Sequence, residues 1–127
     1  MRNRLWFALL AVIALALPAA HAAAADVTGT WTASFDTQIG KQNYTYDFVV
    51  KDSTLTGKAK SDNGESALTE GKVDGDKVTF VETLNFQGMD IRIVYTGTVT
   101  NADEIKFTRQ VADFATEELV ATRVKAK

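Results

Sequence analysis

The sequence predicts an all-β protein, an eight-stranded antiparallel up-and-down barrel, from three observations on residues 26–127. Apolar and polar residues alternate with period two through most of this region, as in strands with one buried face. Short turn sequences separate the alternating segments, and hairpins join strands that are neighbours and antiparallel. No segment has the apolar spacing of an amphipathic helix. A barrel is preferred to the alternative, a two-sheet β-sandwich, because closure removes the exposed edges of the sheet.

Each expected strand carries its own inward row of apolar residues. The first row is Gly29, Trp31, Ala33 and Phe35. The other strands are expected over residues 44–50, 55–59, a short segment around 68, 78–84, 89–95, 105–111 and 119–123. Threonine is abundant between the apolar positions, which suits half-exposed strand faces. Residues 112–119 have room for one helical turn, but the β-branched residues around them favour a strand.

Residues that tolerate positive φ mark the connections between these strands. The tight hairpin signals are Asp62-Asn63-Gly64, Asp74-Gly75 and Asn101-Ala102-Asp103, and the weaker ones are Lys51-Asp52-Ser53 and Phe86-Gln87-Gly88. No low-complexity linker interrupts the pattern. Residues 26–127 are therefore expected to form a single β-barrel domain.

Residues 1–25 are predicted to be a signal peptide. Arg2 and Arg4 give a basic start, Leu5 to Leu17 is an apolar run of 13 residues, and the small residues after Pro18 offer cleavage between residues 22 and 26. A membrane span needs about 20 apolar residues. The run here is shorter, so we expect no membrane span after cleavage. The Ala-rich style of the segment indicates a bacterial protein that is periplasmic or secreted.

Composition excludes several classes of function. Residues 26–127 contain no His, Cys or Pro, which rules out histidine-dependent triads, thiol nucleophiles, His or Cys zinc sites and disulfides. Asp74 and Asp76 belong to one tight turn and lack the ligand spacing of a Ca²⁺ loop, so no metal or cofactor is expected. Basic residues are spread along the chain, without a nucleic-acid footprint. Nothing in the sequence places two of Asp47, Glu82 and Glu117 in one cleft, so we expect no enzyme.

A resemblance to known barrels rests on the start and end of the domain. Thr28-Gly29-Thr30-Trp31 opens the first strand, and Arg123 falls near the end of the last. This combination resembles the lipocalin and avidin group of ligand-binding barrels. The resemblance implies that Trp31 plugs one end and that Arg123 lies across it, since the last strand of a closed barrel pairs with the first. The avidin biotin site requires Asn and Tyr where Ala33 and Lys58 stand, so biotin is rejected.

A wider resemblance covers residues 27–125. It is carried by Gly29-Thr30-Trp31-Thr32, Leu55-Thr56-Gly57, Asp74-Gly75-Asp76-Lys77-Val78, Tyr95-Thr96-Gly97, Asp103-Glu104-Ile105-Lys106-Phe107 and Ala121-Thr122-Arg123-Val124-Lys125. These segments together resemble a small bacterial extracytoplasmic lipocalin-like β-barrel domain family. That family has no settled biochemical function, so the resemblance implies the fold and the compartment only.

Two charged residues interrupt the expected inward rows. Arg109 continues the row of the seventh strand, and Glu82 continues the row of the fifth. A charge inside a barrel needs a partner or a wet lumen. One interpretation is that Arg109, helped by tyrosine hydroxyls, receives an anionic head group. The other is that a bulge turns these charges outward, or that they lie at a solvated rim.

The inward aromatic residues have two interpretations as well. They line a pocket for a small hydrophobic or amphipathic ligand, or they fill the core, because an eight-stranded barrel has a narrow interior. Together with the two charges, the expected ligand-binding set is Tyr44, Tyr46, Phe48, Phe80, Glu82, Tyr95, Phe107 and Arg109.

Apolar residues in the expected turns predict a second kind of function. Ile39, Phe86 and Phe114 lie in or next to connections. They form a contact patch for a protein of the cell envelope, or they fold back over the end of the barrel. The sequence thus favours a ligand-binding barrel, with a protein-interaction or inhibitor module acting through its loops as the alternative. It does not predict the oligomeric state.

Overall fold

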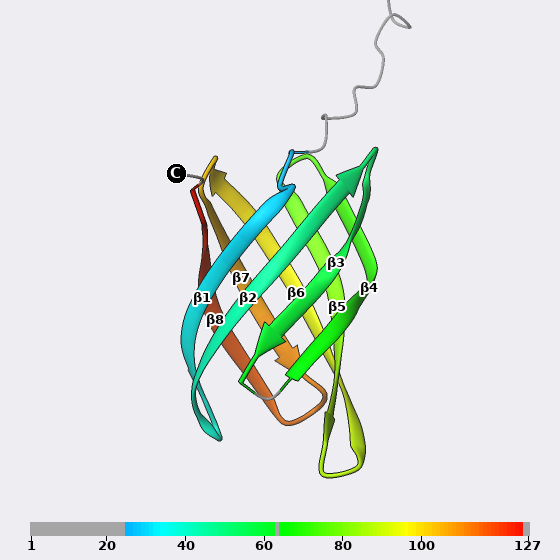
Figure 1. The fold of residues 1–127 in the computed structure, drawn as a ribbon, viewed down its shortest axis with the longest axis vertical. Coiled ribbons are helices and arrows are strands. Elements are labelled where there is room, and N and C mark those ends of the chain that lie inside the picture. Colours follow the sequence, from blue (N-terminus) through cyan, green and yellow to red (C-terminus); the bar gives the residue numbers. More distant parts are fainter. Residues whose placement is uncertain (1–24, 63, 126–127) are drawn as a thin grey trace, which may run out of the picture.

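The structure is a computed structural model that describes residues 25–62 and 64–125. The chain forms one closed antiparallel barrel in which each strand pairs with the next and β8 returns to β1 (Figure 1). The strands are β1 (Gly29–Thr37), β2 (Gly40–Lys51), β3 (Thr54–Ser61), β4 (Gly64–Asp74), β5 (Lys77–Phe86), β6 (Met89–Asn101), β7 (Glu104–Val111) and β8 (Ala115–Arg123). This confirms the predicted up-and-down barrel over the β-sandwich.

Strand β4 is much longer than the short segment expected around residue 68. Its inward residues Leu68 and Val73 are five positions apart, and an odd spacing cannot place two residues on one face of a regular strand. Glu70 has a φ of 53°, and the register with both neighbouring strands shifts beside it. A β-bulge at Glu70 therefore reverses the alternation, which is why the period-two pattern misses half of this strand.

The connections between strands lie at two opposite ends of the barrel. The β1–β2, β5–β6 and β7–β8 connections lie at the lower end in Figure 1, which we call the open end. The start of β1, the end of β8 and the β2–β3, β4–β5 and β6–β7 connections lie at the upper end, which we call the closed end.

Trp31 and Arg123 hold the closed end together. The guanidinium carbon of Arg123 lies 4.5 Å from the centre of the Trp31 ring, a cation–π contact. The indole Nε1 donates a hydrogen bond of 3.0 Å to the carbonyl of Val27. Arg123 also donates to the carbonyls of Asp26 and Thr28, at 3.1 and 2.7 Å. The segment that precedes β1 is thereby fixed across this end.

The closure between β1 and β8 is short. Only Trp31 and Arg123, and Thr32 and Thr122, are paired across it, whereas β1 and β2 are in register along the whole of β1. Towards the open end, the two strands continue without further paired residues. The barrel is therefore closed by fewer paired residues at β1 and β8 than at β1 and β2.

Aromatic rings fill the middle of the barrel. Phe80 and Tyr95 stack with their centroids 4.3 Å apart, and Phe107 meets both rings edge-on at 5.5 and 5.7 Å. The ring centroids of Tyr46 and Phe48 lie 5.9 Å apart in a stacked arrangement, and both rings also contact Phe80. Such ring contacts stabilise a core beyond the burial of their area.

Candidate functional site

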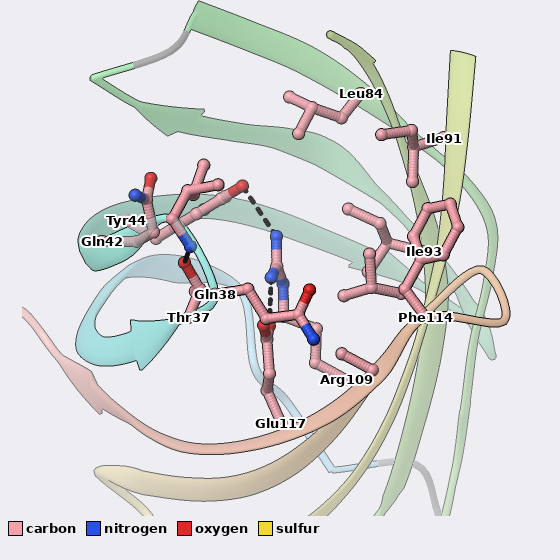
Figure 2. Close-up of a pocket in the computed structure, with 13 residues that line it drawn as sticks. Thr37, Gln38, Gln42, Tyr44, Leu84, Ile91, Ile93, Arg109, Phe114 and Glu117 are labelled. Carbon is pink, nitrogen blue, oxygen red and sulfur yellow. Dashed lines mark hydrogen bonds and ion pairs between the residues drawn. The ribbon is translucent and has the colours of Figure 1, made fainter. Parts of the chain in front are cut away.

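A cavity of about 200 Å³ lies at the open end. Its apolar wall comes from the strands and hairpins around that end and consists of Ile39, Leu84, Ile91, Ile93, Val111, Phe114 and Ala115. Its polar lining consists of Thr37, Gln38, Gln42, Tyr44, Arg109 and Glu117. Among the residues labelled in Figure 2, Thr37, Gln42 and Tyr44 lie on the left, and Ile91, Ile93 and Phe114 lie on the right. A concave, mostly apolar pocket with a few convergent polar groups is the usual form of a small-molecule site.

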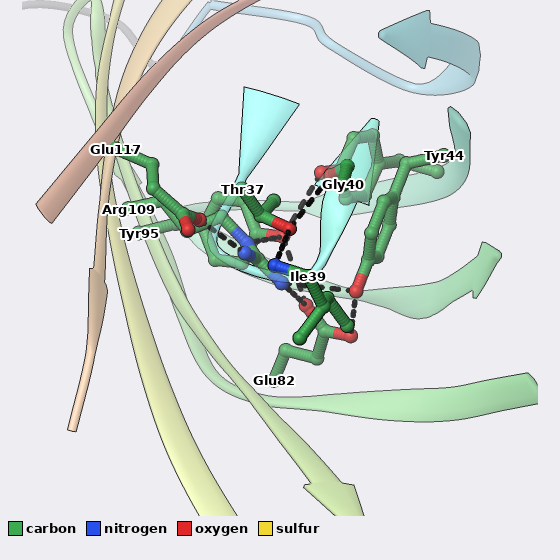
Figure 3. A network of polar contacts seen from close by, with 9 residues as sticks. Thr37, Ile39, Gly40, Tyr44, Glu82, Tyr95, Arg109 and Glu117 are labelled. Atoms are coloured by element: carbon green, nitrogen blue, oxygen red, sulfur yellow. Dashed lines mark hydrogen bonds and ion pairs between the residues drawn. The ribbon is translucent and has the colours of Figure 1, made fainter. Parts of the chain in front are cut away.

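Arg109 is the centre of a buried polar network beneath this cavity (Figure 3). The strand register places it directly beside Tyr95 on β6 and Glu117 on β8. Its Nε donates a hydrogen bond to the Tyr95 hydroxyl at 2.9 Å, and its Nη1 donates to Oε1 of Glu117. Its Nη2 donates to the Tyr44 hydroxyl at 3.0 Å. Arg109 is thus held in one orientation by side chains from three other strands.

Glu82 completes the network from the opposite side. Its Oε2 accepts a hydrogen bond from Tyr44 at 2.9 Å, and its Oε1 accepts one from Tyr95 at 2.8 Å. Because the single proton of Tyr95 is donated to Glu82, Tyr46 must be the donor in its 2.9 Å hydrogen bond with Tyr95. The Nη2 atom of Arg109 lies 3.7 Å from Oε1 of Glu82. The tyrosine hydroxyls therefore relay hydrogen bonds between the arginine and the carboxylate.

The guanidinium of Arg109 is also enclosed by aromatic rings. Its central carbon lies 5.2 Å from the ring centre of Phe35, 5.1 Å from that of Tyr44 and 5.6 Å from that of Tyr95. Burial by itself lowers the pKa of Arg109, but the charges and hydrogen bonds of its neighbours outweigh burial and hold the pKa above its usual value. Arg109 therefore stays charged although it is buried.

The network has a consequence for stability at high pH. Burial, followed by the nearby charge of Glu82, raises the pKa of Tyr44 to about 12, and burial raises the pKa of Tyr46 and Tyr95 well above 10. In the unfolded chain, tyrosine ionises near a pKa of about 10. Above that pH the unfolded state loses protons first, so the free energy of unfolding falls. This contribution is fully present below pH 10 and is lost as the pH rises towards 12.

We therefore expect alkaline unfolding and tyrosine ionisation to coincide. These three are the only tyrosines of the chain, so ultraviolet absorbance of tyrosinate reports on the network directly. It should rise in one cooperative step together with the loss of β-sheet circular dichroism. Tyr44→Phe should lessen the loss of stability over the same pH range. A gradual rise of tyrosinate absorbance near pH 10 in the folded protein would contradict the assignment.

The structure separates the residues expected at a ligand site into three groups. Tyr44 and Arg109 line the cavity. Glu82 is buried, with 1% of its surface exposed, and lies in the network behind them. The other five belong to the aromatic core and do not line this cavity, namely Tyr46, Phe48, Phe80, Tyr95 and Phe107. Both charged residues face the barrel interior, so no bulge turns them outward.

Sequence reasoning left Glu117 out of the site and placed no two carboxylates together. The structure brings Glu82 and Glu117 to the same arginine. A signal was present, since Glu117 continues the inward row of Leu119 and Ala121 by period two. Pairing β7 with β8 across the turn before residue 115 then places Glu117 opposite Arg109.

Two of the expected loop residues lie at the rim of the cavity. Ile39 and Phe114 are 57% and 60% exposed and belong to its lining. Met89, at the start of β6, is exposed as well. The side chain of Phe86 lies outside what the structure describes, as do Asn63 and the expected signal peptide up to residue 24.

Comparison with known proteins adds no relative to this picture. A scan against protein-family models, a search of curated proteins and a search of solved structures each found no match. Among residues 25–62 and 64–125, no group of three or more His, Cys, Asp or Glu could hold a metal ion. In the same part of the chain, no helix is long and apolar enough to cross a membrane. The class that fold and site define is a closed eight-stranded antiparallel barrel with a mixed polar and apolar cavity at one end.

Proposed function

We propose that the protein is a secreted or periplasmic lipocalin-like barrel, not an enzyme, that binds one small amphipathic molecule at its open end. The observation that carries this proposal is the cavity of about 200 Å³. It has an apolar wall and a polar floor, which we define as Tyr44, Arg109 and Glu117, held by hydrogen bonds to one another. An engineered apolar cavity of about 150 Å³ is large enough to bind benzene. The polar part of the ligand rests near Arg109 and Glu117, and its apolar part contacts Ile91 and Phe114.

The contrast between the two ends supports this position for the ligand. At the closed end, Trp31 is completely buried and its ring is covered by Arg123. The aromatic core fills the middle of the barrel. A ligand therefore enters from the hairpins of the open end and stops at Arg109.

Native mass spectrometry of the protein purified gently from its own host tests the proposal. We expect a bound species of small mass that is lost on denaturation. Ala115→Leu should abolish it, because Ala115 lines the cavity and a larger side chain fills the space. Val120→Leu is the matched control on the same strand, since Val120 is 44% exposed on the outside. A bare protein mass in both the wild type and the control would count against a ligand-binding barrel.

The exposed residues Ile39, Met89 and Phe114 support a second function, that of a protein-interaction module. All three lie at the open end, where they form an apolar rim that a protein of the cell envelope could cover. In the same mass spectrometry experiment this function gives a complex with a second protein, and Ala115→Leu leaves that complex intact because the rim is unchanged.

A further inference from the structure

We infer that the molecule bound at the open end presents a protonated amine to the cavity floor, and that the site selects amines over carboxylic acids. This inference rests on the proposed function and specifies the ligand chemistry of the same site. It replaces the anionic head group that the sequence alone suggests for Arg109.

The charges around the floor argue against an anion. Arg109 contributes one positive charge, and Glu82 and Glu117 contribute two negative charges, so the buried group carries a net formal charge of −1. Both oxygens of Glu82 accept hydrogen bonds, the arrangement expected of an ionised carboxylate. An anionic ligand would add a second uncompensated negative charge to a buried site, whereas a cation would bring the site to neutrality.

The second observation is a carboxylate oxygen on the cavity wall. Glu117 lines the cavity, and its side chain is only 10% exposed. Its Oε1 accepts from Arg109, and we expect its Oε2 to face the cavity. An ammonium group has three donors, so one bound in the cavity could give this carboxylate a charge-assisted hydrogen bond.

The apolar wall of the cavity determines which apolar group the ligand carries beside its amine. Leu84, Ile91 and Ile93 lie across the cavity from the polar lining in Figure 2, with Phe114 beside them. A short aliphatic chain or a single aromatic ring therefore suits the space next to the amine. We expect an arylalkylamine or a short alkylamine, and 2-phenylethylamine is a suitable probe.

The experiment compares three probes that share one ring and differ in the head group, namely 2-phenylethylamine, 2-phenylethanol and 3-phenylpropanoate. Each is titrated at neutral pH into the ¹⁵N-labelled protein, and dissociation constants are taken from the amide shifts of Phe114 and Glu117. We expect the amine to bind about tenfold or more tightly than the acid, with the alcohol between them. Glu117→Gln should reduce the preference for the amine about tenfold.

Glu118→Gln is the matched control, because Glu118 is the next residue on β8 and is exposed on the outer face. It should leave the preference for the amine unchanged. Equal or tighter binding of the acid would overturn the inference, while binding of the alcohol at the same amides would leave the proposed function standing. If none of the three probes shifts these amides, both the inference of an amine ligand and the proposed ligand-binding function are contradicted. If Glu117→Gln does not fold, the amine and acid affinities of the wild type decide.

Discussion

Arg109→Met is expected to lower the free energy of unfolding by about 3–5 kcal/mol, the usual cost of removing one partner from a buried ion pair. The substitution keeps a side chain of similar length but leaves Glu82 and Glu117 buried without a cation. The hydroxyls of Tyr44 and Tyr95 also lose the donors that fix their orientation. Urea unfolding followed by circular dichroism measures the loss.

The matched control is Arg92→Met. Arg92 forms a two-point contact with Glu70 at 2.7 and 3.0 Å, but both side chains are more than half exposed. Exposed ion pairs contribute little, so this control should be far less affected than Arg109→Met. Adding Glu82→Gln to Arg109→Met should recover part of the lost stability, because it removes one of the stranded charges. Equal losses for the two arginine variants would show that the network does not stabilise the barrel.

Trp31→Ala is expected to cost about 3–5 kcal/mol, as for other large buried aromatic residues replaced by alanine. Trp31 has none of its surface exposed, and the centres of the Trp31 and Phe48 rings lie 6.4 Å apart. The guanidinium of Arg123 makes a cation–π contact with the Trp31 ring. The substitution opens a cavity at the closed end and leaves the carbonyl of Val27 without its indole donor. Both effects weaken the short closure between β1 and β8.

Trp31→Phe separates these effects, because it keeps a ring under Arg123 and loses only the indole donor and part of the volume. It should be less destabilised than Trp31→Ala and should still bind ligand at the open end. Val49→Ala is the control for a residue on the outside of the barrel, since Val49 is 54% exposed. A Trp31→Ala protein as stable as this control would contradict the role given to the closed end.

The architecture could be predicted from sequence because inward and outward residues alternate with period two in almost every strand. Period-two alternation places Trp31, Phe80 and Ile105 inside, and the structure has all three fully buried. The rule fails at Glu70, where a non-glycine residue with positive φ shifts the register of β4. Nothing in the polar residues around Glu70 distinguishes a bulge from a turn, so the length of β4 could not be predicted.

The site was only partly predictable, because its residues come from strands far apart in the chain. Alternation alone identified Arg109 and Glu82 as charges inside the barrel, and the structure has both inside. Whether Tyr44 and Tyr95 line a cavity or fill the core depends on their height along the barrel axis, which the register of all strands sets together. Glu117 continues the inward row of its strand, but only the β7–β8 register shows that it lies opposite Arg109.

The most direct test of the central claim is an X-ray structure of the protein purified from its own host without added ligand. We predict electron density for a small molecule between Arg109, Glu117 and Phe114, with a polar atom within hydrogen-bond distance of Oε2 of Glu117. The closed end around Trp31 should show none. A cavity filled by Ile39 and Phe114 folded inward would contradict the account and would leave the rim of the open end as a surface for protein contacts.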